Sequence, residues 1–163
     1  MDKNALHDLA PKQLDRILGF FARVEAKASF LFAVNSALLG SLAVHVQKTD
    51  FERLANLASL VVALTLIGLS FYFVYRCSFP NLHGGNSSLI YFAEIAKLRE
   101  QEYLKSFRTL SADEFADDAL AQAWRNSQIL TEKFHAIRIA FILTGLGLAP
   151  WALFLVLASM GHP

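Results

Sequence analysis

The chain has 163 residues, of which 55% are hydrophobic and 18% are charged, and its mean hydropathy is +0.38. An ordinary water-soluble domain carries more polar side chains than this, so the composition argues against one. The formal net charge of +1 gives no reason to expect nucleic acid as a partner.

The hydrophobic residues gather in three runs without a charged side chain, at residues 28–46, 54–75 and 139–161. Each run has about 19 to 23 residues, which at a rise of about 1.5 Å per residue matches the ~30 Å hydrocarbon core of a bilayer. Three buried core helices are the alternative. Such helices need a polar face toward water, however, and the second run has only scattered uncharged polar residues. We therefore predict three transmembrane helices.

A polar stretch precedes the first run, and between residues 14 and 46 only Gly19 and Gly40 weaken a helix. One helix is therefore predicted to continue from this stem into the membrane. The run also resembles the apolar region of a signal peptide, but it starts late and lacks a clear cleavage site. Asn35 lies inside it, and two hypotheses stay open: a hydrogen bond to a neighbouring helix or subunit, or one to its own helix backbone.

The polar segment after the second run is also predicted to be helical. Pro80 ends the helix of the second span, and the glycine pair at 84–85 allows a turn. A polar residue within 86–88 then caps a helix that continues to Phe107 or Arg108, because apolar residues recur there at helical spacing.

A further helix begins at Ser111, which has the capping-box spacing to Glu114. No glycine or proline follows until Gly145, so this helix is predicted to run directly into the third span. Apolar residues along it and along the first stem are expected to pack together. Both helices would then extend beyond the membrane.

Lys and Arg residues stand before the first span, after the second and before the third, whereas the charges of the 47–53 connection balance. Because these residues prefer the cytoplasmic side, the N-terminus and the middle region are predicted to be cytoplasmic. The single cysteine, Cys77, excludes an intramolecular disulfide, and we expect it to serve packing rather than lipidation.

The predicted fold class is an all-α integral membrane protein, with three transmembrane helices and long cytoplasmic helical extensions that form a small helical cytoplasmic domain. The expected order is a cytoplasmic N-terminal helical stem (1–27), transmembrane helix 1 (28–46), an external loop (47–53), transmembrane helix 2 (54–76), a cytoplasmic helical ligand-sensing region (77–136) and transmembrane helix 3 (137–160).

Signals for catalysis are missing from the sequence. The five histidines have no metal-ligand spacing, so no metal or cofactor is expected, and no nucleophile motif indicates an enzyme. The remaining polar residues suit a small anion better. A capped helix start presents free amides to a phosphate, with Arg125, Lys133 or Arg138 as the countercharge and Tyr91 to stack on a base. A plain helix cap is the alternative for Ser87 and Ser88.

Three stretches together resemble the membrane effectors of Pycsar antiphage systems. They are EAKAS at 25–29 followed by FLFAVN, FPNLHGGNSSLIYFAEIAKLREQEYL at 79–104, and NSQIL at 126–130 followed by Lys133-Phe134 and Ile137-Arg138. The likeness covers nearly the whole chain from about Gln13. Glu25 stands where an Asp is expected, which is a mild departure.

The resemblance implies a multi-pass protein of the bacterial inner membrane that binds a cyclic pyrimidine mononucleotide, cyclic CMP or cyclic UMP. A partner nucleotide cyclase would make this ligand on phage infection, and the activated effector would then impair membrane integrity and abort the infection. With this ligand in view, Arg23 and Lys27 are predicted to join the helices near Ser88 and Lys133 in a cytoplasmic pocket. Interfacial anchoring is the alternative for these two cations.

The predicted ligand-binding residues are Arg23, Lys27, Asn86, Ser87, Ser88, Tyr91, Arg125, Lys133 and Arg138. Three spans are too few to enclose a generous pore, so a homo-oligomer in the lipid bilayer is also expected. The alternative function is a non-gating membrane anchor or accessory subunit that docks a cytoplasmic partner.

Overall fold

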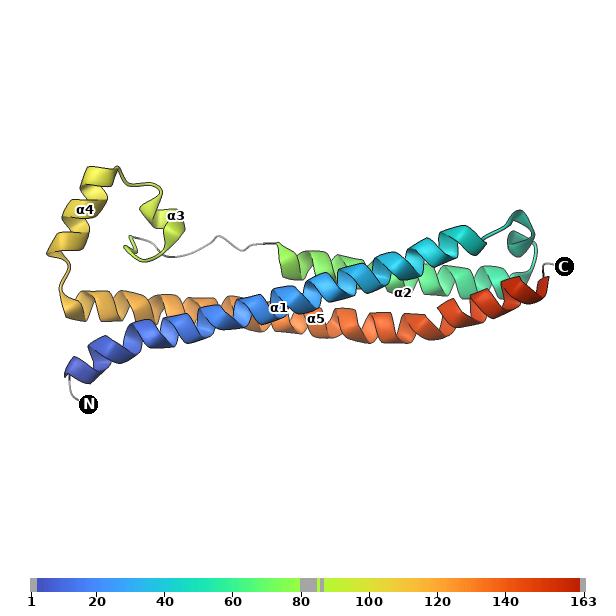
Figure 1. Ribbon diagram of the computed structural model, residues 1–163, viewed down its shortest axis with the longest axis horizontal. Coiled ribbons are helices and arrows are strands. Elements are labelled where there is room, and N and C mark those ends of the chain that lie inside the picture. The colour runs from blue at the N-terminus through green and yellow to red at the C-terminus, as the bar shows by residue number, and fades with distance from the viewer. Residues whose placement is uncertain (1–2, 80–84, 86, 162–163) are drawn as a thin grey trace. The chain divides into compact units, whose positions relative to one another are not determined.

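The computed structural model describes residues 3–79, 85 and 87–161. Within them all regular secondary structure is helical, and no strand occurs (Figure 1). The elements are α1 (Lys3–His45), the 3-10 helix η1 (Lys48–Phe51), α2 (Leu54–Ser78), α3 (Phe92–Ile95), α4 (Glu100–Thr109) and α5 (Ala112–Gly161). The predicted all-α class is confirmed.

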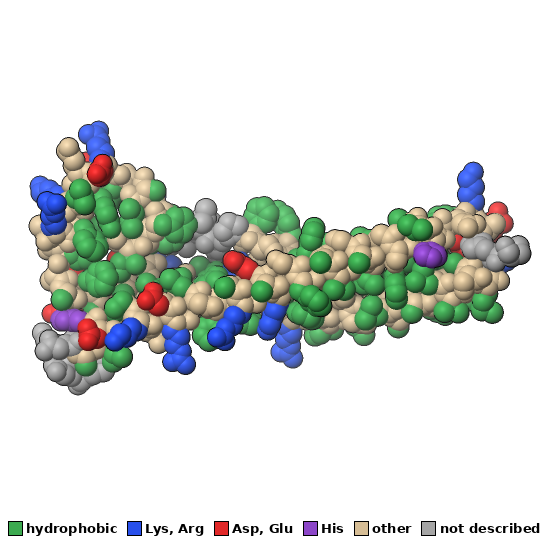
Figure 2. Space-filling model, in the orientation of Figure 1, with side chains coloured by type: hydrophobic (Ala, Val, Ile, Leu, Met, Phe, Trp, Pro, Cys, Tyr) green, Lys and Arg blue, Asp and Glu red, His purple; other side chains and the backbone are tan. Residues whose placement is uncertain are grey.

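Three helices are long and apolar enough to cross a membrane, namely Ala5–His45, Leu54–Ser78 and Ala112–Met160. On the face drawn in Figure 2, their apolar portions expose hydrophobic and uncharged side chains, while charged side chains lie toward their ends. The three predicted transmembrane helices are thus confirmed as elements. Their exposed apolar surface suits lipid as the surrounding solvent.

The long continuous helices are confirmed as well. α5 begins directly after Ser111 and runs through to Gly161, and α1 begins at Lys3, well before the predicted Leu14. The chain divides into two compact units, which are described separately. Unit 1 comprises residues 1–23 and 80–132, and unit 2 comprises residues 24–79 and 133–163.

Unit 1 has a core of small side chains. Ala116, Ala119 and Ala123 follow one another on the same stripe of α5, and they pack with Ala10 and Leu14 of α1. Because alanine carries only a methyl group, this stripe lets the two backbones approach closely. The apolar stems that the sequence predicted to pack together do so here.

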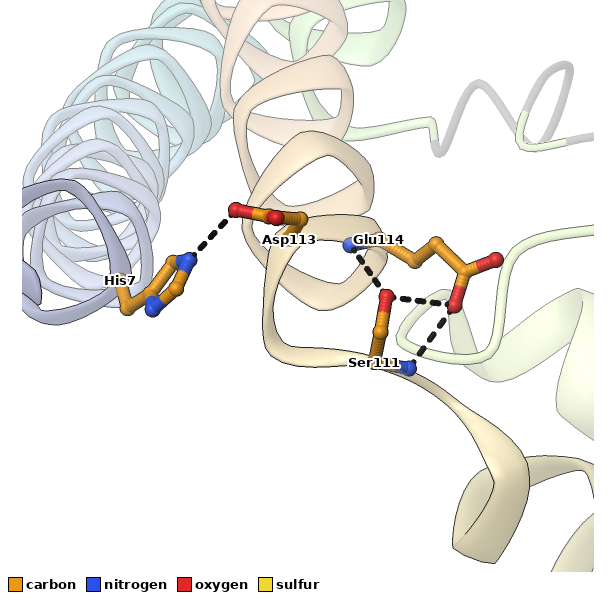
Figure 3. A network of polar contacts seen from close by, with 4 residues as sticks. All are labelled: His7, Ser111, Asp113 and Glu114. Carbon is orange, nitrogen blue, oxygen red and sulfur yellow. Dashed lines mark hydrogen bonds and ion pairs between the residues drawn. The ribbon is translucent and has the colours of Figure 1, made fainter. Parts of the chain in front are cut away.

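A polar contact and a helix cap lie at the start of α5 in unit 1 (Figure 3). His7 Nε2 is 2.7 Å from the Asp113 carboxylate oxygen Oδ1. Glu114 accepts hydrogen bonds from the Ser111 hydroxyl at 2.7 Å and from the Ser111 backbone N–H at 2.8 Å, while the Glu114 N–H donates back to the hydroxyl at 3.2 Å. The predicted capping box is confirmed.

Unit 2 contains a larger apolar core made by all three apolar helices. Its buried members are Leu38, Leu42, Leu60, Ala63, Ile67, Phe154 and Ala158. Gly147 of α5 lies against this core, since a methyl group added there would stand 3.4 Å from Ile67 Cγ1. The packing in unit 2 is therefore specific and close.

A buried carboxylate, that of Asp50, accepts hydrogen bonds from both sides of the connection between α1 and α2. The side chain of Asp50 is only 2% exposed. Its Oδ2 accepts a hydrogen bond from the Gln47 N–H at 2.9 Å, and its Oδ1 accepts one from Asn56 Nδ2 at 2.7 Å. Asp50 thereby ties the start of the connection, at Gln47, to the first turn of α2.

One helix prediction was wrong. The segment expected to form a single helix from 86–88 to about Arg108 contains the short α3 and, after a break, the separate helix α4. The break lies at Arg99, whose ψ of 148° is extended and whose N–H donates to Glu102 Oε2 at 3.3 Å. This second capping box starts a new helix, and its sequence signal competes with the apolar periodicity. Pro80, Gly84 and Asn86 lie outside the described residues.

Candidate functional site

Three uncharged polar side chains meet inside unit 2, one from each apolar helix. Asn35 Nδ2 donates to the Ser70 hydroxyl at 2.9 Å, and the Thr144 hydroxyl donates to Asn35 Oδ1 at 3.0 Å. The hydroxyls of Ser70 and Thr144 are 2.8 Å apart, which closes a ring. We call these three residues the polar ring.

The polar ring is buried and internally satisfied. Asn35 is 0% exposed, Ser70 is 0% exposed and Thr144 is 6% exposed. The Ser70 hydroxyl also lies 3.0 Å from the Ala140 carbonyl, so its proton has two acceptors within reach. Burying such groups costs free energy unless they are paired, so the ring fixes the register of the three helices. Of the two hypotheses for Asn35, the bond to a neighbouring helix is confirmed.

Lys133 also makes a buried hydrogen bond within unit 2. Its side chain is 8% exposed, and its ammonium group donates to the Cys77 carbonyl at 2.5 Å. That carbonyl belongs to the last turn of α2, where backbone acceptors have no helical partner and a cation is favoured by the helix dipole. Cys77 itself is buried as a free thiol, in line with the predicted packing role.

Lys27 and Arg138 line a shallow groove between α1 and α5 in unit 2. The groove has a volume of about 400 Å³ and is also lined by Phe134, His135, Ile137 and Phe141. The Lys27 ammonium stands 5.6 Å from the centre of the Phe134 ring, within the range of a cation–π interaction. Two of the predicted ligand-binding cations thus share one surface.

In unit 1, the backbone amides at residues 87 and 89–91, which were expected to be free for an anion, have hydrogen-bond acceptors, so the phosphate site stays a prediction. The Ser88 hydroxyl donates to Asp118 Oδ2 at 2.9 Å and accepts from the Tyr91 N–H at 2.9 Å and the Ile90 N–H at 3.2 Å. The Leu89 N–H also donates to Asp118, at 3.0 Å. Ser88 thus holds the turn before α3 together, with the acidic Asp118 as its partner.

Arg125, another predicted ligand-binding residue of unit 1, has a buried nitrogen that makes no hydrogen bond to the described residues. This nitrogen is Nη1 of the guanidinium group. A methyl group added to Gly85, whose φ is +84°, would stand 2.5 Å from the Tyr91 ring and 3.1 Å from Arg125 Nη1. Gly85, Tyr91 and Arg125 thus converge on one point.

Ser87 and Arg23 have local roles. Ser87 has a left-handed φ of 60°, and its N–H donates to Glu94 Oε2 at 3.4 Å. The bond from Lys97, together with this backbone bond, holds the pKa of Glu94 below its usual value. The Arg23 guanidinium lies over the Phe20 ring of its own helix, 5.0 Å from the ring centre. This self-contained contact suits interfacial anchoring.

The predicted ligand set therefore falls into two groups. Lys27, Lys133 and Arg138 belong to unit 2, whereas the rest belong to unit 1, with Asn86 outside the described residues. A single pocket that contains all of them stays a prediction. In the part of the chain that the structure describes, no three His, Cys, Asp or Glu side chains gather as a metal site.

Ser70 and Thr144 were not predicted as partners of Asn35, although the sequence contains a signal for them. Lys27, Arg76 and Arg138 flank the three apolar runs at the end that is predicted to be cytoplasmic. Asn35 lies eight positions from Lys27, Ser70 lies six from Arg76, and Thr144 lies six from Arg138. At about 1.5 Å per residue they share one depth in the membrane. Isolated polar residues at a common depth are typical of interhelical hydrogen bonds.

Comparison with known proteins gives one clear result. The family model described as the Pycsar effector protein domain matches residues 9–158. No curated protein and no solved structure matches the chain. The family match spans nearly all of the described helices, including the three apolar ones. The chain therefore belongs to the Pycsar effector family.

Proposed function

We propose that this protein is a cyclic-nucleotide-activated effector that binds cyclic CMP or cyclic UMP and impairs the integrity of the bacterial inner membrane. Membership of the Pycsar effector family and three apolar helices support a membrane effector of an antiphage system. The ligand would come from a partner nucleotide cyclase. The distribution of Lys and Arg supports a cytoplasmic N-terminus.

The observation that carries ligand binding is the buried Nη1 of Arg125, which has no hydrogen-bond partner among the described residues. An unpaired guanidinium donor out of water costs free energy, and a phosphate oxygen removes that cost through a charge-assisted hydrogen bond. The Tyr91 ring lies beside the same point, since both groups approach Gly85. In this proposal, Arg125 binds the cyclic phosphate and Tyr91 stacks on the pyrimidine.

Activation requires that the ligand binds one packing of the helices better than another. α1 and α5 each begin in unit 1 and end in unit 2, so both helices contribute to the proposed ligand-binding unit and to the membrane-spanning unit. The polar ring in unit 2 would be released when the spans change partners. Three spans enclose little space, so the active state is proposed to be a homo-oligomer.

The test uses liposomes that contain the full chain and a trapped dye. The vesicles are challenged with cyclic CMP, cyclic UMP, cyclic AMP and cyclic GMP, and binding is measured in parallel by calorimetry on the detergent-solubilised protein. We expect leakage with one pyrimidine nucleotide alone. Arg125→Gln should weaken its binding by roughly tenfold or more, because one charge-assisted hydrogen bond is lost.

Arg108→Gln is the matched control. It removes the same charge from the same unit, at an exposed position on α4. Equal binding by the wild type and Arg125→Gln would remove Arg125 from the ligand site. Failure of every nucleotide to bind a folded and inserted chain would count against the effector and favour a membrane anchor.

A further inference from the structure

The groove between α1 and α5 in unit 2 combines two kinds of surface. Lys27 and Arg138 give it a cationic part, and Phe134 and Phe141 give it an apolar part. Phe134, Ile137, Arg138 and Phe141 follow helical spacing along one stripe of α5, and Phe141 continues this stripe about one turn beyond Arg138, the last charged residue. A ligand that fills the groove must itself be charged at one end and apolar at the other.

The groove also lies at a defined level of the spans. Lys27 is the last charged residue before the uncharged run of α1, and Arg138 is the last one before the uncharged run of α5. Phe141 is already inside that run, with 41% of its surface exposed. The cationic part therefore coincides with the boundary of the hydrocarbon core, and the apolar part continues into it.

Among the residues that the structure describes, no carboxylate lines the groove to neutralise its cations. The nearest acidic residue along α1 is Glu25, which is two positions from Lys27 and therefore lies about 200° around the helix. The Lys27 ammonium rests over the Phe134 ring. The groove thus keeps its positive charge for a ligand.

We propose that this groove binds one anionic phospholipid. The phosphate would lie between Lys27 and Arg138, and an acyl chain would follow Phe141 into the hydrocarbon region. A free nucleotide has the phosphate but no acyl chain, so it would leave the apolar part of the groove unfilled. The proposal concerns a lipid site and goes beyond activation by a cyclic nucleotide.

Native mass spectrometry on the detergent-solubilised full chain tests the site. The probes are phosphatidylglycerol and phosphatidylcholine with identical acyl chains, so only the headgroup charge differs. Lys27→Gln/Arg138→Gln should weaken phosphatidylglycerol binding by roughly 25-fold, because each cation near an anionic headgroup contributes a factor of about five. Binding of phosphatidylcholine should change little.

Lys48→Gln/Arg53→Gln is the matched control, because it removes two exposed cations from the connection between α1 and α2. It should keep the affinity for phosphatidylglycerol. An equal loss in both double variants, or no preference for phosphatidylglycerol in the wild type, would overturn the proposal. Circular dichroism checks that each variant is folded.

A competition arm separates this site from the nucleotide site. Cyclic CMP and cyclic UMP are added to the protein with phosphatidylglycerol bound. Loss of nucleotide binding in Lys27→Gln/Arg138→Gln, together with displacement of the lipid, would assign the groove to the nucleotide and overturn the lipid proposal. Retention of phosphatidylglycerol by the wild type at saturating cyclic CMP and cyclic UMP supports a separate lipid site.

Discussion

The hydroxyl of Thr144 in α5 donates a hydrogen bond to Oδ1 of Asn35 in α1, 3.0 Å away, within the apolar part of unit 2. The two residues are 109 positions apart in the chain, and Ser70 of α2 bridges them. This contact joins the first and last apolar helices by a directional bond, and a second such bond runs from Trp151 Nε1 to the Ser41 hydroxyl at 2.8 Å, beside the apolar core.

A double-mutant cycle should measure this bond. Asn35→Ala and Thr144→Val should show a coupling free energy of about 1 kcal/mol, the usual range for hydrogen bonds between transmembrane helices. Unfolding in mixed micelles supplies the four stabilities. Ser36→Ala with Thr65→Val is the control cycle, because both hydroxyls are exposed and bond to their own helix backbone. A coupling no larger than in the control would show that the ring does not hold the helices together.

The capping box at the start of α5 should make that end of the helix pH-dependent. The hydrogen bond from the Ser111 hydroxyl, aided by the Ser111 N–H, holds the pKa of Glu114 below its ordinary value of 4.5. A lowered pKa stabilises the fold above the unfolded value, and this contribution is lost as the pH falls below 4.5 and through the lowered pKa.

Ser111→Ala removes the main cause, so the Glu114 pKa should rise toward 4.5. Carboxyl carbon shifts in an NMR titration measure this change, and amide exchange at Asp113 to Phe115 reports fraying. Ser127→Ala serves as the control, because that hydroxyl bonds to the Trp124 carbonyl within α5. An unchanged Glu114 titration in Ser111→Ala would rule out the hydroxyl as the cause.

Removing the Lys133 ammonium should loosen the end of α2. Lys133→Met leaves the Cys77 carbonyl without this donor, and the loss of a cation at a helix C-terminus costs about 1 kcal/mol. Amides in the last turn of α2 should then exchange roughly fivefold faster by hydrogen–deuterium exchange. Lys48→Met removes an exposed lysine and should leave this turn unchanged. Equal exchange in both variants would contradict the capping role.

Two adjacent aspartates offer a sharp test of the turn before α3. Asp118→Ala deprives the Ser88 hydroxyl and the Leu89 N–H of their acceptor and should destabilise unit 1 by about 1 to 2 kcal/mol. Asp117→Ala changes the same charge at an exposed position, so it should have little effect. Thermal unfolding, with amide exchange at Leu89 to Tyr91, separates them. Equal losses of stability in Asp118→Ala and Asp117→Ala would mean that Asp118 contributes only its charge and not its hydrogen bonds.

The sequence predicts most of the fold because its signals are local. An uncharged run of about 20 residues has one stable solution in lipid, and the Ser111–Glu114 spacing is a complete cap within four residues. The break at Arg99 is an exception: Glu102 supplies an equally local cap, but the sequence-based prediction gave more weight to the apolar periodicity of the segment.

The site was less predictable because its partners are distant in the chain. The Ser88 position favours a cap from sequence, yet its acceptor Asp118 is 30 residues away, and only the fold brings them together. Likewise, Lys133 looks like a free cation until its contact with the Cys77 carbonyl, 56 residues away, is seen. One sequence holds no information that pairs these residues.

Asp50 makes the first two spans a fixed hairpin. Its carboxylate, 2% exposed, bonds to the Gln47 N–H before η1 and to the Asn56 side chain in α2, so the connection between α1 and α2 cannot lengthen or twist without breaking both bonds. α5, by contrast, reaches α2 through residues 79–111 and bonds to it in unit 2 through side chains such as Thr144 and Lys133. In the proposed homo-oligomer, a subunit that changes partners would therefore exchange α5, by breaking these side-chain bonds, and would keep its hairpin intact.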